Sequence, residues 1–196
     1  MKRILIPALL SVIFQACAII HTPGFNSGYK RLTNEEKEKI FFVRSIDDIP
    51  CQNDGRIMAI TARQLTGLLN NNGKTLLYLW SPHCSSNVCV SLGKIQAFCD
   101  KADFRLYVLT EYYTDAFLQN EILSNPMLSV NELYYKTSYC NLYLKRFLSE
   151  LMPKGQKQSV SYNRYLLFLN GQYIQSYEKI EEIESCSNSN CSDSRP

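Results

Sequence analysis

Apolar runs and stretches with helical spacing alternate along this chain. The run at 75–80 is continuously apolar, which is typical of a strand buried on both faces of a sheet, and 104–110 predicts a second such strand. Further strands are predicted at 41–46, 56–60, 165–169 and 173–177, the last two joined by Asn170-Gly171 as a β-hairpin. Helical spacing predicts helices over 61–70, 84–102, 116–123 and 131–151. This order predicts the α/β class, with a central mixed sheet flanked by helices.

The N-terminal residues have the pattern of a secretory signal. Lys2 and Arg3 precede an apolar run at 4–14, and small residues follow it up to Ala18. The run is shorter than the roughly 20 apolar residues that span a bilayer. We therefore expect an exported protein in the periplasm or at a membrane surface.

Two ways of processing this signal fit the sequence. Phe14-Gln15-Ala16-Cys17 resembles a bacterial lipobox, with Phe14 in place of the usual Leu, and predicts lipidation of Cys17. Alternatively, Ala16-Cys17-Ala18 is an A-x-A cleavage site, and Cys17 is lost. In the first case acyl chains hold the protein on a membrane.

The rest of the chain divides by composition. After the signal at 1–18, residues 19–40 are polar and mixed and predict a tether with one helical turn near its end. A single domain is expected at 41–183, and the Ser-, Asn- and Cys-containing tail at 184–196 predicts a flexible segment.

Charge argues against nucleic-acid binding. The 196 residues contain 21 Lys and Arg against 18 Asp and Glu, and two of the positive charges, Lys2 and Arg3, belong to the signal. A balance this even gives little attraction for a phosphate backbone.

Cys84 is the main candidate for chemistry. It follows the buried run at 75–80 and opens a predicted helix, where free N–H groups and the helix dipole lower the pKa of a thiol. His83 beside it adds to this effect when protonated. Sites in open α/β sheets also form at the carboxyl ends of strands.

These residues resemble the thioredoxin superfamily. Trp80-Ser81-Pro82-His83-Cys84 is similar to the family's W-x-x-x-C segment, and Leu-Leu-Phe-Leu-Asn-Gly at 166–171 is similar to its final hairpin. The resemblance covers roughly 56–177. It implies a thioredoxin-like fold with a helical insertion around 131–151, and redox chemistry at Cys84 supported by Trp80, Pro82 and His83.

Two positions depart from the family pattern. The family's pair is C-x-x-C, but Asn87 stands at the second position and the next cysteine is Cys89. Cα atoms five positions apart in a regular helix are about 8–9 Å apart, whereas a disulfide needs about 7 Å or less. Cys84 and Cys89 therefore pair only if the first turn is irregular. Asn163 occupies the place of the family's cis-proline.

Three hypotheses for Cys84 follow. It forms an unusual redox pair with Cys89, it is a lone nucleophile resolved by Cys186 or Cys191 of the tail, or it is structural. The last two cysteines are also close enough to bridge each other.

The other cysteines and the histidines point to no metal or cofactor. Cys99 and Cys140 fall on apolar helix faces and are expected in the core, and Cys51 lies in a loop. Copper delivery in this superfamily uses a distant histidine, but His21 falls in the tether and His83 adjoins Cys84. The tail has no second cysteine pair for zinc.

The sequence thus predicts an exported, membrane-anchored protein that exchanges thiols and disulfides with envelope proteins through Cys84, with Cys89 as the resolving thiol. A peroxidase is less favoured, because the T-x-x-C context of peroxiredoxins is absent. The alternative is a non-catalytic thioredoxin-like scaffold that binds a protein partner. For that role, the tyrosines on 131–151 form either a core face or a partner-binding surface.

Overall fold

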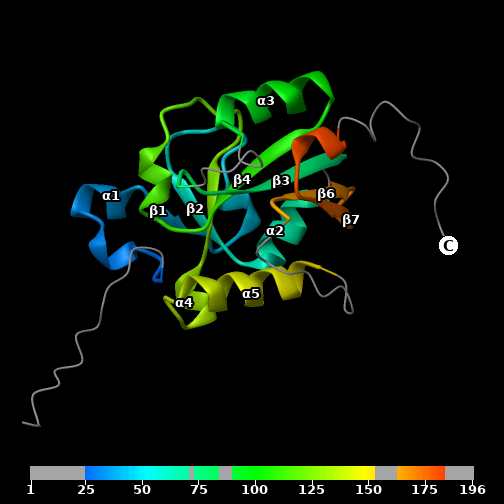
Figure 1. The fold of residues 1–196 in the computed structure, drawn as a ribbon. Helices are drawn as coiled ribbons and strands as arrows, with labels where there is room; N and C mark the ends of the chain where they lie inside the picture. The colour runs from blue at the N-terminus through cyan, green and yellow to red at the C-terminus, as the bar shows by residue number, and fades with distance from the viewer. Residues whose placement is uncertain (1–24, 71–72, 84–89, 153–162, 184–196) are drawn as a thin grey trace, which may run out of the picture.

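The computed structural model describes residues 25–70, 73–83, 90–152 and 163–183. They form a three-layer α/β fold, in which a central sheet lies between helix α3 on one side and helices α2, α4 and α5 on the other (Figure 1). The predicted signal at 1–18 and the predicted tail at 184–196 lie outside the described residues.

The sheet has seven strands in the order β1-β2-β5-β4-β3-β6-β7. Five are parallel, and they are β1 (Ile40–Phe42), β2 (Ile57–Ile60), β5 (Met127–Val130), β4 (Arg105–Thr110) and β3 (Lys74–Trp80). The antiparallel hairpin of β6 (Tyr165–Leu169) and β7 (Gln172–Tyr177) completes the sheet beside β3. The prediction of a mixed α/β sheet is confirmed.

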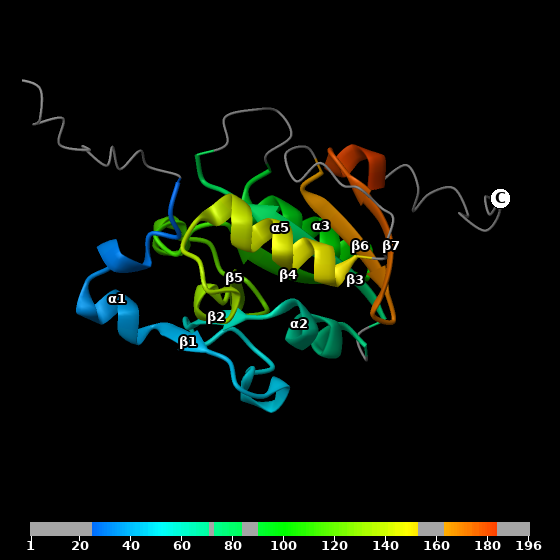
Figure 2. The same ribbon diagram turned by 90° about the horizontal axis from the view of Figure 1, so that it is seen from below.

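Each face of the sheet has its own hydrophobic core, because successive side chains of a strand point to opposite faces. Leu77 and Leu79 of β3 face α2 (Ala62–Leu69) and α5 (Cys140–Leu151), which also contact each other. Tyr78 and Trp80 face α3 (Leu92–Lys101). Figure 2 shows α5 crossing β3 and β4 on its side of the sheet.

Residues 25–39, expected within the tether, pack on the rest of the domain. Leu32 is buried, and Ser27 donates its N–H to the Ser138 carbonyl at 2.8 Å. The expected helical turn is present as α1 (Asn34–Glu38), after a 3-10 turn at Tyr29–Arg31. Thr33 and Glu36 close a capping box at its start, which explains why this polar segment is helical.

Two helix predictions change in the structure. The helix predicted over 131–151 is divided into α4 (Glu132–Tyr135) and α5, because Lys136 adopts the left-handed conformation at φ 53° and ends α4. The helix predicted over 116–123 is only a 3-10 turn, Asp115–Leu118. A further 3-10 turn lies at Ile46–Asp48.

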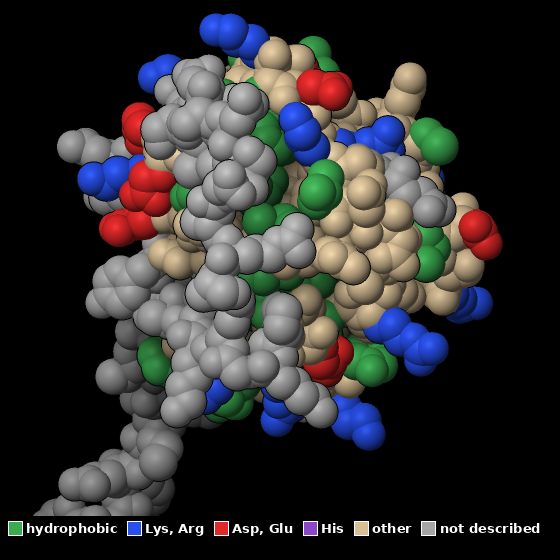
Figure 3. Space-filling model, turned by 90° about the vertical axis from the view of Figure 1, so that its right-hand side faces the viewer, with side chains coloured by type: hydrophobic (Ala, Val, Ile, Leu, Met, Phe, Trp, Pro, Cys, Tyr) green, Lys and Arg blue, Asp and Glu red, His purple; other side chains and the backbone are tan. Residues whose placement is uncertain are grey.

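Side chains of both charges are interspersed on the side of the molecule that carries β7 (Figure 3). None of the described helices is long and apolar enough to cross a membrane.

Candidate functional site

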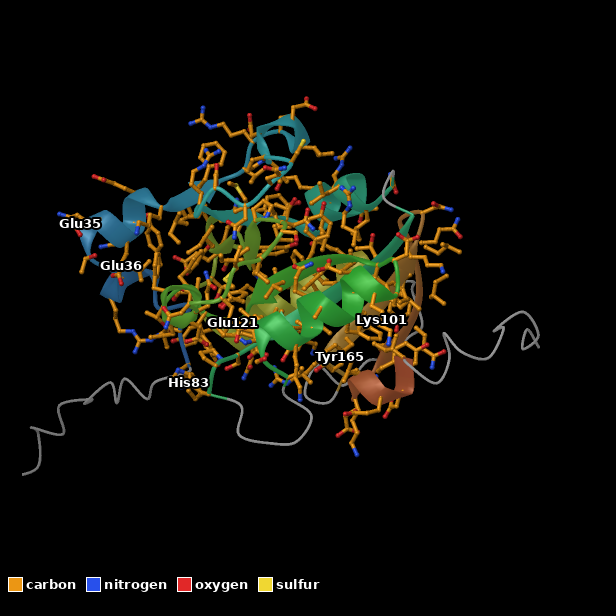
Figure 4. The ribbon with its side chains drawn as sticks, turned by 90° about the horizontal axis from the view of Figure 1, so that it is seen from above. Glu35, Glu36, His83, Lys101, Glu121 and Tyr165 are labelled. Carbon is orange, nitrogen blue, oxygen red and sulfur yellow. The ribbon has the colours of Figure 1, made fainter. Side chains whose placement is uncertain are left out.

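The carboxyl end of β3 leads directly to the predicted nucleophile. Trp80 is the last residue of β3 and is buried, Pro82 is half-buried, and His83 is exposed. Figure 4 shows His83 at the rim of the molecule, away from Lys101 at the end of α3. Cys84 and Cys89 lie outside the described residues.

The helix predicted over 84–102 is not continuous. Val90 is not helical, and α3 starts at Leu92, where the Ser91 hydroxyl caps it by accepting the N–H of Lys94 at 3.3 Å. The cap explains why α3 begins here, because Ser91 satisfies a free N–H group of the first turn. The predicted start at Cys84 lies outside the described residues. The N-terminus of α3 is therefore eight residues beyond Cys84 in sequence.

His83 is paired with a buried carboxylate. Its Nε2 lies 3.4 Å from Oδ1 of Asp115, and the two side chains are 70% and 3% exposed. Burial raises the pKa of Asp115, while His83, Ser81 and Arg31 lower it. The second oxygen, Oδ2, is buried with no hydrogen-bond partner among the described residues.

A second ion pair connects three strands at the same edge. Arg164, which precedes β6, donates from Nη1 to Glu111 Oε1 at 3.0 Å and to the Leu79 carbonyl of β3 at 3.0 Å. Glu111 directly follows β4. Burial raises the pKa of Glu111, and Arg164 opposes that shift.

Asn163, the residue at the family's proline position, lies beside the end of β3. The carbonyl of Arg164 accepts the N–H of Leu79 at 2.8 Å, so the start of β6 adjoins the β3 end. Asn163 itself donates from Nδ2 to the Ser176 hydroxyl of β7 at 2.7 Å. The chain thus brings this position to the edge of the sheet at which β3 ends.

Cys140 is a core residue that lies next to Glu111, at the carboxyl end of β4. Its Sγ donates to the Glu111 carbonyl at 3.4 Å, and the Tyr143 hydroxyl donates to the same oxygen. Burial raises the pKa of the Cys140 thiol to about 11, so the thiol is protonated at neutral pH. Such a thiol is neither a nucleophile nor a metal ligand.

The remaining described cysteines, Cys99 and Cys51, differ in burial. Cys99 is fully buried, and burial raises its pKa to about 12, which confirms the prediction of a core residue. Cys51 is exposed, and both, like Cys140, are free thiols. The predicted lipidation site Cys17 and the tail residues Cys186 and Cys191 lie outside the described residues.

The tyrosines of residues 131–151 are divided between the core and the surface. Tyr135 and Tyr143 are buried in the core beneath α4 and α5, whereas Tyr134 and Tyr139 are 56% and 52% exposed. Within the described part of the chain, no group of three or more His, Cys, Asp or Glu residues is arranged to hold a metal ion.

Sequence reasoning missed Glu111 and Asp115. A signal was present, because both follow the buried strand at 104–110, and polar residues after such a strand collect at the carboxyl edge of a parallel sheet. We call this group of Ser81, His83, Glu111, Asp115 and Arg164 the carboxyl-edge site.

The carboxyl-edge site can bind and move a proton, since it places an exposed imidazole against a buried carboxylate. Its second ion pair fixes the ends of β3, β4 and β6 relative to one another. No family model, no characterised protein and no solved structure matches this chain.

Proposed function

We propose that this protein is an exported, lipid-anchored, thioredoxin-like protein that exchanges thiols and disulfides with other envelope proteins through Cys84. Export and anchoring rest on the signal pattern and on Cys17 in the lipobox-like segment. The redox role rests on the place of Cys84 in the sequence, after the carboxyl end of β3, and on the chemistry of the described residues that precede it.

The topology supports the thioredoxin-like assignment. Two βα units lead from β2 through α2, β3 and α3 to β4, and an antiparallel hairpin pairs with β3. The Leu-Leu-Phe-Leu-Asn-Gly segment of the resemblance lies in the β6–β7 hairpin, which pairs with β3 through β6. Strand β5, which lies between β2 and β4, is outside the predicted order of elements.

The observation that carries the proposal is the pairing of His83 with Asp115 directly before Cys84. Nε2 of His83 lies 3.4 Å from Oδ1 of the buried Asp115, and this contact orients the imidazole of the residue that directly precedes Cys84. Reactive cysteines lie in polar, partly exposed surroundings. The side chain of His83 is 70% exposed.

The exchange proceeds in two steps that conserve electrons. The Cys84 thiolate attacks one sulfur of a substrate disulfide, a mixed disulfide forms, and the other substrate sulfur leaves as a thiolate that takes up a proton. The Cys89 thiolate then attacks Cys84 and releases the second substrate thiol. The substrate is reduced by two electrons as Cys84 and Cys89 become a disulfide, and the reverse sequence oxidises a substrate dithiol.

Trapping of mixed disulfides tests the proposal. In the exporting cell, Cys89→Ser removes the resolving thiol and should accumulate Cys84-linked partners that dithiothreitol releases. Cys84→Ser should trap none, and Cys51→Ser, which alters an exposed thiol elsewhere, should behave as the wild type. Equal adducts in Cys84→Ser and Cys89→Ser would contradict a role for Cys84.

The alternative is a non-catalytic scaffold, and one observation favours it. The helix that was to activate Cys84 begins only at Leu92, so this thiol lacks the N-terminus of α3 as an immediate neighbour in sequence. In that case Cys84→Ser leaves folding and partner binding intact.

A further inference from the structure

Exposed apolar side chains are concentrated on the first described residues and on the segment from α4 to the start of α5. Ten large hydrophobic residues are exposed in the described part of the chain, and half of them belong to the first described residues, to α4 and to the start of α5. These five are Phe25, Leu133, Tyr134, Tyr139 and Leu142, and we call them the aromatic patch. Each is between 47% and 62% exposed, so a substantial apolar area meets solvent here.

The patch is held together by backbone pairing between distant parts of the sequence. Cys140 donates its N–H to the Phe25 carbonyl at 3.1 Å, and Asn26 forms a bridge with Tyr139. The rings of Phe25 and Tyr139 meet edge to face, with centroids 6.5 Å apart. These contacts place the first described residues beside the start of α5. The N-terminal segment therefore belongs to the same surface as the connection from α4 to α5.

The chain that leaves the patch leads to the proposed anchor. Phe25 is only eight residues beyond Cys17. An extended chain spans at most about 3.6 Å per residue, so acyl chains on Cys17 would keep Phe25 within about 29 Å of the membrane surface. The patch is thus the part of the domain closest to the anchor along the chain.

The charges around the patch fit a phospholipid surface. Lys136, which follows α4, and Lys145 and Arg146 of α5 are exposed, and Glu150 is the one exposed carboxylate of the two helices. Cations close to an anionic leaflet are attracted to its surface. Exposed tyrosines favour the interface between headgroups and acyl chains, because the ring is apolar and the hydroxyl is polar.

We propose that the aromatic patch lies on the lipid bilayer when the protein is anchored through Cys17. This inference rests on the lipid anchor of the proposed function. A bilayer is favoured over a protein partner because apolar side chains, adjacent cations and the short distance to the anchor occur together on one surface.

Hydroxyl-radical labelling of the anchored protein tests this docking. The acylated protein, with a site-specific protease site placed within 19–24, is reconstituted into vesicles of phosphatidylethanolamine and phosphatidylglycerol at 3:1. It is labelled before and after cleavage and dilution, and modification is read by mass spectrometry. Labelling of Tyr134, Tyr139 and Leu142 should rise at least about fivefold on release. Ile122 and Ile174, which are 91% and 48% exposed on other elements, should not change.

Two double variants distinguish binding through the aromatic patch from non-specific adsorption of exposed apolar residues to the vesicles. Leu133→Ser with Tyr134→Ser should abolish the protection of Tyr139 and Leu142 in vesicles, whereas Ile122→Ser with Ile174→Ser should preserve it.

Three results would overturn the inference, and they differ in which part of the proposed function they also contradict. Equal labelling before and after cleavage, with Cys17 acylated by mass, overturns bilayer docking alone. Protection in native membranes but not in pure lipid assigns the patch to a protein partner. An unmodified Cys17 overturns the anchor and the docking together, while exchange through Cys84 is still tested by mixed-disulfide trapping.

Discussion

His83 is exposed to solvent and Asp115 is buried, and this difference determines what the pair can do chemically. Asp115 is held by the fold with 3% of its side chain exposed, so it presents a fixed carboxylate to a histidine that solvent and substrate can reach. In the proposed exchange, an imidazole held in this way would stabilise negative charge on the sulfur of the cysteine that follows it.

Replacement of Asp115 by Asn should slow Cys84 without unfolding the protein. The amide keeps the shape of the side chain but removes the negative charge that faces Nε2 of His83. Because a partly exposed pair contributes about 0.2–1 kcal/mol, the alkylation rate at pH 7 should fall roughly twofold and its pH profile should move to higher pH. Asp54→Asn, which removes an exposed charge paired with Arg56, is the matched control. An unchanged profile in Asp115→Asn would exclude this role.

Glu111 makes stability depend on pH. Burial raises the pKa of its carboxyl above the ordinary value of 4.5. Because the folded state then binds the proton more tightly than the unfolded state, this contribution to the free energy of unfolding is full below about pH 4.5 and is lost as pH rises through the raised pKa. Glu111→Gln keeps an acceptor for Arg164 and should flatten the decline above pH 4.5 in denaturant titrations. Glu35→Gln, at an exposed position, should follow the wild type, and identical slopes in all three proteins would contradict the argument.

At the scale of elements, the β6–β7 hairpin depends on its turn. Asn170 and Gly171 have φ of 48° and 78°, and a Cβ at Gly171 would lie 2.9 Å from the Asn70 Cα and closer still to the Asn70 side chain. Gly is therefore required for both its backbone conformation and its size.

Gly171→Ala should destabilise the protein more than Gly55→Ala. Both positions have positive φ, which costs about 1–2 kcal/mol for a residue with a Cβ, but the space around Gly55 is open. Thermal unfolding should show the smaller loss in the free energy of unfolding for Gly55→Ala. The loss for Gly171→Ala should be greater by at least about 1 kcal/mol, because the added Cβ overpacks against Asn70. Equal losses would mean that Asn70 moves away freely.

Elements with a strong local signal were predictable from the sequence. The apolar run ending at Trp80, the capped helix beginning after Thr61 and the Asn-Gly hairpin each have a local cause, and all three are present. The short strand Met127–Val130 was missed, because its four residues form a strand only by pairing with β2 and β4. The break after Tyr135 was missed for a similar reason, since residues 26 and 27 pair with the connection that follows it.

The candidate site was predictable in part. The position of Trp80 to His83 after a buried strand indicated the correct edge of the sheet. The partner of His83 could not be derived, because Asp115 is 32 residues away and its burial depends on the tertiary packing of the turn after β4.

At the scale of the whole molecule, the N-terminal segment connects the aromatic patch to the carboxyl-edge site. Ser27 accepts the N–H of Tyr113 at 2.7 Å, and Arg31 lowers the pKa of Asp115 through its charge. A bilayer beneath the patch would therefore place the site close to the membrane surface. The substrates expected from this arrangement are cysteines in membrane-bound proteins or near the surface.

The central claim is that Cys84 is a reactive thiol, and its alkylation rate against pH is the most direct test. The mature protein is measured before and after mild reduction, with each cysteine resolved by mass spectrometry and with buried Cys99 and exposed Cys51 as internal references. The account predicts fast alkylation of Cys84 that titrates well below about 8.5, the value for free cysteine. A Cys84 that stays unreactive after reduction would contradict the exchange function and leave the protein as a binding scaffold.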